Sequence, residues 1–174
     1  MPRCKHCKEK FVTRYFNQKH CLSKDECIKA HSEMVKANNW KKEKKKLKQD
    51  LMRKQDYEKA LQVLVNKYVR LRDVDKPCVS CGIALVGKFD AGHYYPAGSY
   101  KNVRFNTDNI HGQCVACNQH KHGNLINYTD RLPFRIGGKR FKELKHQSQI
   151  ERHYTIPELK ELIDKYKLKI KLWK

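Results

Sequence analysis

The sequence is poor in acidic residues, in apolar residues and in long apolar runs. Its 174 residues include 18 Asp and Glu, and hydrophobic residues make up 39% of the chain. A hydrophobic fraction below that of ordinary globular domains argues against a large core. No stretch reaches the length of a membrane-spanning helix, and the start Met1-Pro2-Arg3-Cys4 lacks the apolar segment of a secretory signal. We therefore expect no membrane association and a location in the reducing cytoplasm, where cysteines remain thiols.

The shortage of acidic residues leaves a strong positive charge. Lys and Arg number 39, and the formal net charge is +21. Such a surface repels itself unless a polyanion covers it, and nucleic acid is the natural polyanion. Keeping a small protein in solution rarely needs so much charge. We expect nucleic acid, and no small-molecule substrate, as the partner.

Glycine and proline are missing between residues 3 and 76, so a long helix is plausible there. Its Lys-rich part is expected to be solvated, with Lys44, Lys45 and Lys46 as candidate DNA contacts. Further along, apolar residues recur at spacings of four and three and share one helical face. This stripe either packs on the following domain or forms the seam of a homodimer. Its members are Tyr57, Leu61, Leu64, Tyr68 and Leu71.

The eight cysteines form two groups of four, and each group opens with C-x-x-C, which favours metal ligation over disulfides. The later group forms two C-x-x-C knuckles, which suit a closed, structural tetrahedral zinc site. The earlier group has an unusual last gap but is compatible with a small zinc finger, with Phe11 and Phe16 as its core and His6 or His20 as substitute ligands. We expect two structural zinc ions per chain. The two groups are Cys4, Cys7, Cys21 and Cys27, then Cys78, Cys81, Cys114 and Cys117.

Short apolar pieces between Cys78 and Asn106 suit a β-hairpin, and a helix opening near Cys117 would complete a ββα unit. A helical piece around Phe141–Leu144 is only weakly indicated, because glycines precede it. Thr155–Glu158 is typical of a capping box that starts a last amphipathic helix. The fold class expected is small, zinc-stabilised α+β. Its expected segments are a zinc finger at 1–30, a Lys-rich helical linker at 31–76, a ββα unit at 77–128 and C-terminal helices at 129–174.

The order of motifs resembles a known group of nucleases. After the first knuckle come D-A-G-H-Y from Asp90 and N-I-H-x-Q-C-x-x-C-N-x-x-K-x-G-N from Asn109. This order resembles the treble-clef HNH nucleases, including phage endonuclease VII, and nearly the whole chain resembles the NinG/Rap recombination proteins of lambdoid phages. The resemblance implies a ββα-metal (HNH) finger that hydrolyses phosphodiesters in branched DNA, as a Holliday junction resolvase does. It also implies one catalytic Mg²⁺ or Mn²⁺, branched or duplex DNA as partner, and a phage protein working in the bacterial host cell.

The resemblance assigns roles to particular residues. It implies that His93 is the general base, that Asn118 is a ligand of the catalytic cation, and that Asn109 orients the histidine. Many HNH enzymes have an acid or a histidine just before the base, where this chain has Gly92. Asp90, two residues earlier, points to the same side of a strand and is the expected substitute ligand. The alternative for this carboxylate is a turn or strand-end hydrogen bond.

Other residues around the second knuckle keep two interpretations. His120 and His122 follow Asn118 on the expected helix, and His122 is either a third ligand or phosphate-facing. His111 either supports the knuckle or touches DNA. Expected phosphate contacts are Lys101, Arg104 and Lys121.

Three functions stay open at this stage. The first is a structure-selective nuclease, and the second is a less selective HNH nicking enzyme. The third is a non-catalytic zinc-finger nucleic-acid-binding protein in which His93 is only packed. The combination of His93, Asn109 and Asn118 favours catalysis, since binding alone does not need it.

Overall fold

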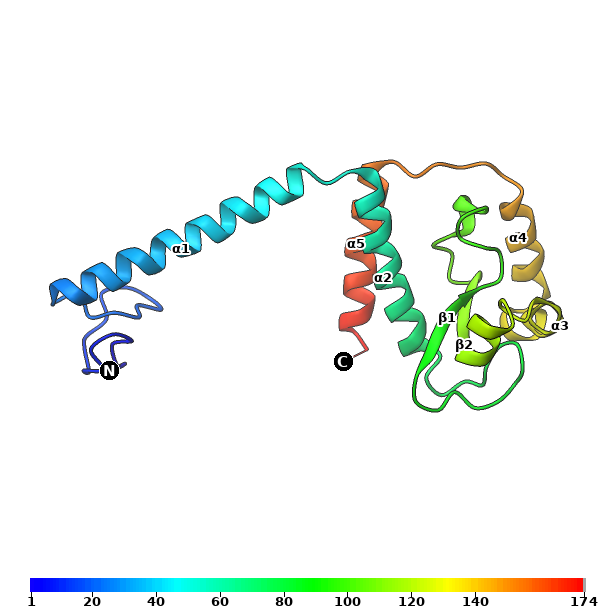
Figure 1. Ribbon diagram of the computed structural model, residues 1–174, viewed down its shortest axis with the longest axis horizontal. Coiled ribbons are helices and arrows are strands. Elements are labelled where there is room, and N and C mark those ends of the chain that lie inside the picture. The colour runs from blue at the N-terminus through cyan, green and yellow to red at the C-terminus, as the bar shows by residue number, and fades with distance from the viewer. Residues whose placement is uncertain (174) are drawn as a thin grey trace. The chain divides into compact units, whose positions relative to one another are not determined.

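A computed structural model describes residues 1–173 and divides the chain into two compact units, Met1–Met52 and Arg53–Lys174 (Figure 1). The single long helix considered for residues 3–76 does not form. Two helices take its place, α1 (Asp25–Asp50) and α2 (Lys54–Arg72). The backbone of Arg53 is extended, and its N–H donates to the Asp56 carboxylate at 2.9 Å. This interaction caps α2 and starts a new helix where the sequence has no glycine or proline.

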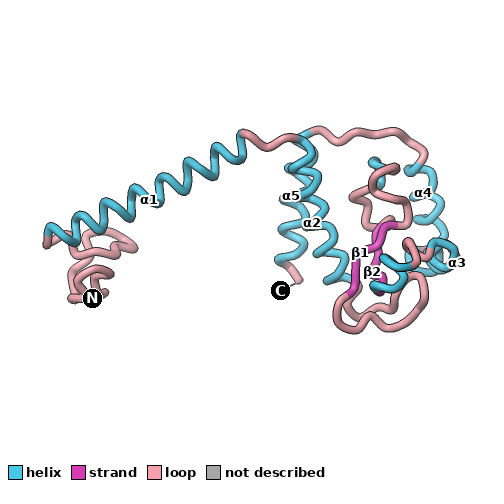
Figure 2. The backbone as a smooth tube through the Cα atoms, in the orientation of Figure 1, coloured by secondary structure: helices cyan, strands magenta, loops and turns pink. Residues whose placement is uncertain are grey.

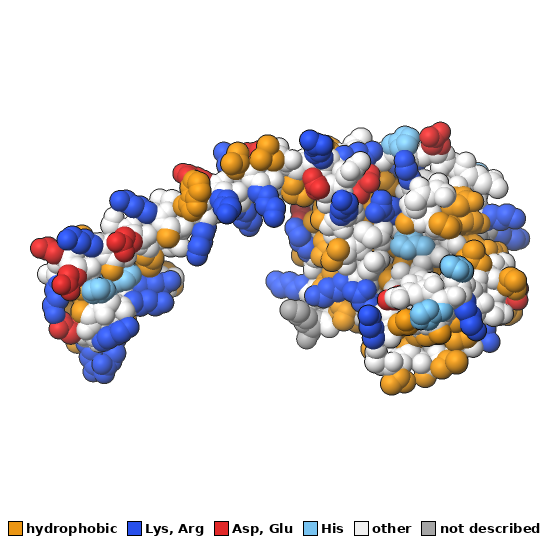
Figure 3. Space-filling view, in the orientation of Figure 1, with side chains coloured by type: hydrophobic (Ala, Val, Ile, Leu, Met, Phe, Trp, Pro, Cys, Tyr) orange, Lys and Arg blue, Asp and Glu red, His pale blue; other side chains and the backbone are white. Residues whose placement is uncertain are grey.

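The first unit consists of loops around a cysteine tetrad, followed by α1. Cys4, Phe11 and Cys27 form its small core. Phe16, expected in this core, is 91% exposed, so that expectation was wrong. A four-sulfur cluster and one aromatic ring suffice to organise so few residues. The rest of α1 is largely exposed, and Figure 3 shows lysine side chains along it.

The second unit is built on a two-stranded antiparallel sheet. Strand β1 (Phe89–His93) pairs with β2 (Ile110–Cys114), and the register runs from Phe89 opposite Cys114 to His93 opposite Ile110. A long connection containing the 3₁₀ turn η1 (Lys101–Val103) joins the strands (Figure 2). The expected hairpin within residues 78–106 therefore contains only the first strand. Aromatic residues of the connection pack in the core instead of pairing, so the partner strand comes later.

Four helical elements follow β2. They are η2 (Ala116–His120), a short π-helix, then α3 (Leu125–Ile136), α4 (Gly138–Ser148) and α5 (Ile156–Lys171). Most of α3 falls within the C-terminal helical region expected at 129–174, although the helix begins at Leu125 and contains Pro133. Its buried side chains Tyr128, Leu132 and Ile136 recur every four residues and pack with Leu144 of α4. The capping box of α5 is confirmed: Thr155 and Glu158 exchange bonds between side chain and backbone. No helix within residues 1–173 has both the length and the apolar character needed to cross a membrane.

The apolar stripe of α2 packs inside the second unit, against α5 and the sheet (Figure 1). Tyr57 and Leu61 of the predicted stripe are buried, but Leu64, Tyr68 and Leu71 are only half-buried, and Val65 and Val69 fill the other buried positions of the helix. Tyr68 packs edge-on against Tyr166 of α5 with ring centroids 5.5 Å apart. Of the two interpretations of this stripe, the geometry supports packing. Using Leu61 as a dimer seam would require α5 to move away.

The carboxylate of Asp73, just after α2, joins this helix to the sheet. One oxygen accepts the backbone N–H of Gly112 at 3.0 Å and a guanidinium N–H of Arg72 at 2.7 Å. The same Arg72 nitrogen donates to the backbone carbonyl of Ile110 at 2.8 Å. Burial alone would raise the pKa of Asp73, but the bonds from Arg72 outweigh it and lower the pKa to about 2. Asp73 is 1% exposed, so this pair lies in the interior.

We expect Asp73→Ala to lower the free energy of unfolding by roughly 3 kcal/mol or more, because it leaves the N–H of Gly112 without its partner and the Arg72 charge without its carboxylate. Urea unfolding at pH 7 with zinc in excess measures this. The control is Asp75→Ala, at an exposed position two residues away. Because folding lowers the pKa of Asp73, its contribution is present above pH 4 and is lost as the pH falls towards 2. Equal unfolding midpoints for the two variants would contradict the proposed role of Asp73 in joining α2 to the sheet.

Candidate metal centres and nuclease site

The two cysteine groups each bring four sulfurs together, and each tetrad could hold a metal ion. All four sulfurs of a tetrad lie within 4.8 Å of one another. Cys4 and Cys27, like Cys81 and Cys114, have sulfurs 3.8 Å apart. A tetrahedron with zinc–sulfur bonds of about 2.3 Å has edges of about 3.8 Å. The donor set and its spacing therefore fit two zinc ions, and no sulfur pair is close enough for a disulfide within residues 1–173.

The second tetrad is supported by hydrogen bonds to its sulfurs. The N–H of Cys114 donates to Cys78 at 3.4 Å, and the Asn124 amide donates to Cys117 at 3.4 Å. Burial would raise the pKa of Cys78, but backbone N–H groups outweigh it and lower the pKa to about 7. Burial raises the pKa of Cys117 to about 12, and neighbouring thiols add to the rise. A bound cation would offset this repulsion among thiolates, which suits a site that folds around metal.

His93 is the last residue of β1 and is half-buried. Its Nε2 lies 3.0 Å from the backbone carbonyl of Arg104. A carbonyl only accepts, so Nε2 carries the proton of the neutral ring and Nδ1 keeps its lone pair. Burial lowers the pKa of His93 below its usual 6.5, although the Arg104 carbonyl acts in the opposite direction. The ring is therefore neutral at physiological pH and able to accept a proton.

Asp90 of β1 and Asn118 of η2 contact each other through their side chains. The Asn118 amide donates to Asp90 Oδ2 at 3.0 Å, and the Gln119 amide donates to the same oxygen at 2.8 Å. The oxygen of Asn118 is directed towards Gly92, 3.0 Å from the position that a Cβ there would take. A carboxylate and a side-chain carbonyl are the hard ligands that Mg²⁺ and Mn²⁺ prefer. These residues fit a divalent cation.

The side chain of Gln113 fills the space beside Gly92, the position where many HNH enzymes have an acid or a histidine. A side chain there would overlap the end of Gln113. The position of the usual ligand is thus closed by a neighbour, and Asp90 lies on the same face of β1.

Asn109 is fully buried and holds the loop that follows His93. Its oxygen accepts the N–H of Tyr95 at 2.7 Å, and its amide donates to the carbonyls of Tyr95 and Val103 at 3.0 and 3.1 Å. No direct bond joins Asn109 to His93 within residues 1–173. The asparagine therefore acts on the histidine through the loop that carries the Arg104 carbonyl.

The other histidines lie in three different settings. His111 is buried, and its Nδ1 lies 3.1 Å from the hydroxyl of Tyr128. Burial lowers the pKa of His111 to about 3, so it is a neutral core residue that neither binds zinc nor reaches DNA. His120 ends η2 and is exposed. His122 was expected on the same helix but lies beyond it with a positive φ of 48°, in a turn completed by Gly123.

The expected phosphate contacts differ in availability. Lys101 and Lys121 are exposed. The guanidinium of Arg104 is held by α2, donating to Gln62 at 3.0 Å and pairing with Glu58 at 3.4 Å. Lys44, Lys45 and Lys46 lie on exposed turns of α1, in the first unit.

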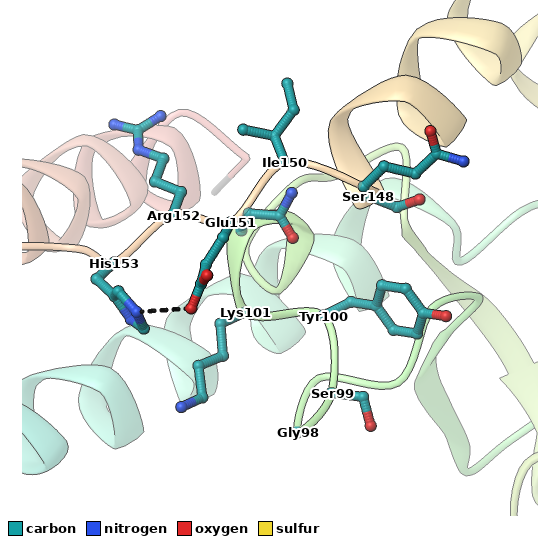
Figure 4. Close-up of a pocket in the computed structure, with 11 residues that line it drawn as sticks. Gly98, Ser99, Tyr100, Lys101, Ser148, Ile150, Glu151, Arg152 and His153 are labelled. Carbon is teal, nitrogen blue, oxygen red and sulfur yellow. Dashed lines mark ion pairs between the residues drawn. The ribbon is translucent and has the colours of Figure 1, made fainter.

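Lys101 borders a hollow of about 430 Å³. Figure 4 shows this hollow between the loop at 98–102 and the connection from α4 to α5 at 148–153. His153 in its wall pairs with Glu151 at 3.3 Å. Lys101 and Arg152 also border a second hollow of about 200 Å³ next to Lys54. Lys101 and Arg152 thus lie in the walls of both hollows.

Comparison with known proteins identifies the family of the chain. The family model described as Bacteriophage Lambda NinG protein matches residues 1–174. This chain belongs to the NinG family. Protein ninG of Escherichia phage 933W is 36% identical over 186 residues, which cover 97% of this chain and 92% of the relative. The proteins of the same name from Escherichia phage lambda and Salmonella phage P22 are 45% and 43% identical over 114 residues, covering 65% of this chain and 55% of each relative. No solved structure matches the chain.

Two residues that position the site in this NinG-family chain were missed from the sequence. The hydroxyl of Tyr128 donates to the carbonyl of Gly92 at 3.2 Å and must then accept from His111, which fixes β1 next to His93. Asp73 fixes β2 through Gly112. Tyr128 lies on the first turn of α3, before the helical region expected at 129–174, and a single acid after a helix carries no sequence signal. The periodicity of Tyr128, Leu132 and Ile136 is the one signal that could have located α3.

Proposed function

We propose that this chain is a metal-dependent DNA endonuclease with an HNH-type, treble-clef active site that cuts branched recombination intermediates. The observation that carries the proposal is a neutral histidine at the end of β1, the same strand on which Asp90 meets Asn118. A zinc module that only bound nucleic acid would need neither feature. The preference for branched DNA rests on the resemblance to NinG/Rap proteins and treble-clef nucleases.

The proposed chemistry assigns one task to each side chain. Nδ1 of His93 takes a proton from the attacking water, while the Arg104 carbonyl holds the other ring nitrogen. Asp90 and Asn118 hold the cation, which when bound supplies positive charge to the phosphate and the leaving oxygen. Because neighbouring residues of a strand point to opposite faces, His93 and Gly92 face opposite sides of β1.

Phosphate binding is proposed for the basic residues outside this centre. Lys101 and Lys121 are exposed in the second unit, and Lys44, Lys45 and Lys46 lie on α1. Contacts of this kind position a duplex without reading its bases, so affinity should fall steeply with salt. A junction has two symmetric scissile strands, so a homodimer is the simplest assembly, acting in the cytoplasm of the phage host. Its seam would have to lie outside the packed stripe of α2.

The test is cleavage of a four-way junction, a fork and a linear duplex by zinc-loaded protein, with and without Mg²⁺ or Mn²⁺. We expect cleavage of the junction only when the divalent cation is present, and weaker cleavage of the linear duplex. Equal cleavage of all three substrates would favour a less selective HNH nicking enzyme. Binding without cleavage in either metal would overturn the nuclease proposal and favour a zinc-finger binding protein.

A further inference from the structure

Gln113 is a buried amide at the edge of the proposed cation site. It lies on β2 directly opposite Asp90 of β1. Residues paired in this way share a face of the sheet, with Cβ atoms about 4.5–5.5 Å apart. Its side chain is fully buried. The nuclease chemistry described above gives it no role.

The orientation of this amide is fixed by its partners. Nε2 donates to Ser80 Oγ and to the backbone carbonyl of Gly123, both at 2.6 Å. The hydroxyl of Ser80 donates to the same carbonyl at 3.2 Å. A carbonyl only accepts, so the nitrogen must face Gly123 and Oε1 must face the other way.

Oε1 of Gln113 has no hydrogen-bond partner among residues 1–173. It occupies the space where Gly92 would have a side chain, and Oδ1 of Asn118 borders the same space. Burying an oxygen without a partner is costly. Two carbonyl oxygens cannot bond to each other, whereas a cation or a hydrogen-bond donor near both would give Oε1 the partner that it lacks.

We propose that Oε1 of Gln113 is a third protein ligand of the divalent cation, together with Asp90 and Asn118. This rests on the proposed function only in requiring that the cation binds there. The role of Gly92 follows, because any side chain at that position would displace the ligand. Ser80 lies between Cys78 and Cys81, so the first C-x-x-C knuckle of the second tetrad also holds Gln113 in place. The structural metal thereby supports the site of the catalytic one.

The test measures Mn²⁺ binding to zinc-loaded protein without DNA, by the loss of the electron paramagnetic resonance signal of free Mn²⁺. We expect Gln113→Met, which keeps the length but removes the oxygen, to raise the Kd by about tenfold or more. The matched control is Gln149→Met, because Gln149 is an exposed amide of the same unit, just after α4 and away from the proposed ligands. Its Kd should stay close to that of the wild type.

Gly92→Ala provides a second route if Gln113→Met loses zinc or unfolds. It keeps Gln113 and its donors but pushes a Cβ against Oε1, so the Kd for Mn²⁺ should again rise. A wild-type Kd in either folded variant would overturn the proposal, and so would a wild-type protein that binds no Mn²⁺. Failure of the nuclease proposal looks different: Mn²⁺ binds and depends on Gln113, but no DNA is cut.

Discussion

Replacing His93 with alanine is expected to lower kcat/KM for junction cleavage by about 10²- to 10⁴-fold and to leave junction binding and zinc content unchanged. The substitution removes the proton acceptor at the end of β1. Among residues 1–173 the ring makes one hydrogen bond, to the Arg104 carbonyl, and none to a zinc ligand. Single-turnover cleavage, gel-shift binding and zinc analysis of the same preparation measure the three quantities.

The control is His153→Ala, which removes an exposed histidine of the same unit. It should cleave like the wild type. Because burial lowers the pKa of His93, the wild-type kcat/KM should rise with pH through an apparent pKa below 6.5 and then level off. An equal loss of junction binding and cleavage in His93→Ala would contradict the assignment of a base. Unchanged cleavage would exclude it.

The features predicted from sequence are those that depend on local spacing. C-x-x-C pairs place two sulfurs on one tight turn, so both tetrads could be predicted before any tertiary structure was known. The capping box at Thr155 needs residues only three positions apart. The predicted pair of Asp90 and Asn118 also lies together. The alternation of side chains along a strand was enough to choose Asp90 over Gly92.

The features that were missed depend on contacts between distant segments. Asp73 holds Gly112 across 39 positions, and Gln113 holds Ser80 across 33. Neither residue type indicates these partners. His122 shows the opposite error: helical spacing placed it beside Asn118, but η2 ends at His120 and His122 has a positive φ of 48°. Local patterns predict candidate metal ligands, whereas contacts between distant segments determine which residues hold those ligands in position.

The largest effect on folding is expected from Cys114→Ser, which should unfold the hairpin of the second unit. Zinc binding to such sites supplies roughly 10–16 kcal/mol, as much as the whole stability of an ordinary domain. Cys114 ends β2, and its sulfur lies 3.8 Å from that of Cys81. Removing the Cys114 sulfur therefore removes the link between β2 and the Cys78–Cys81 knuckle. We expect zinc to fall from two ions to one per chain, with loss of protease resistance in residues 53–173 and of cleavage.

Cys4→Ser is the matched control, because it should also remove one zinc but from the first unit, which makes its own small core. The second unit should then keep its protease resistance and its Mn²⁺ site, since all the proposed catalytic residues lie after residue 52. Of the two variants, only Cys114→Ser should lose Mn²⁺ binding. Fewer than two zinc ions in the wild type would exclude a metal in the first tetrad. A Cys114→Ser variant that keeps its fold and Mn²⁺ site would show that packing of α2, α3 and α5, rather than zinc, holds β2 in place.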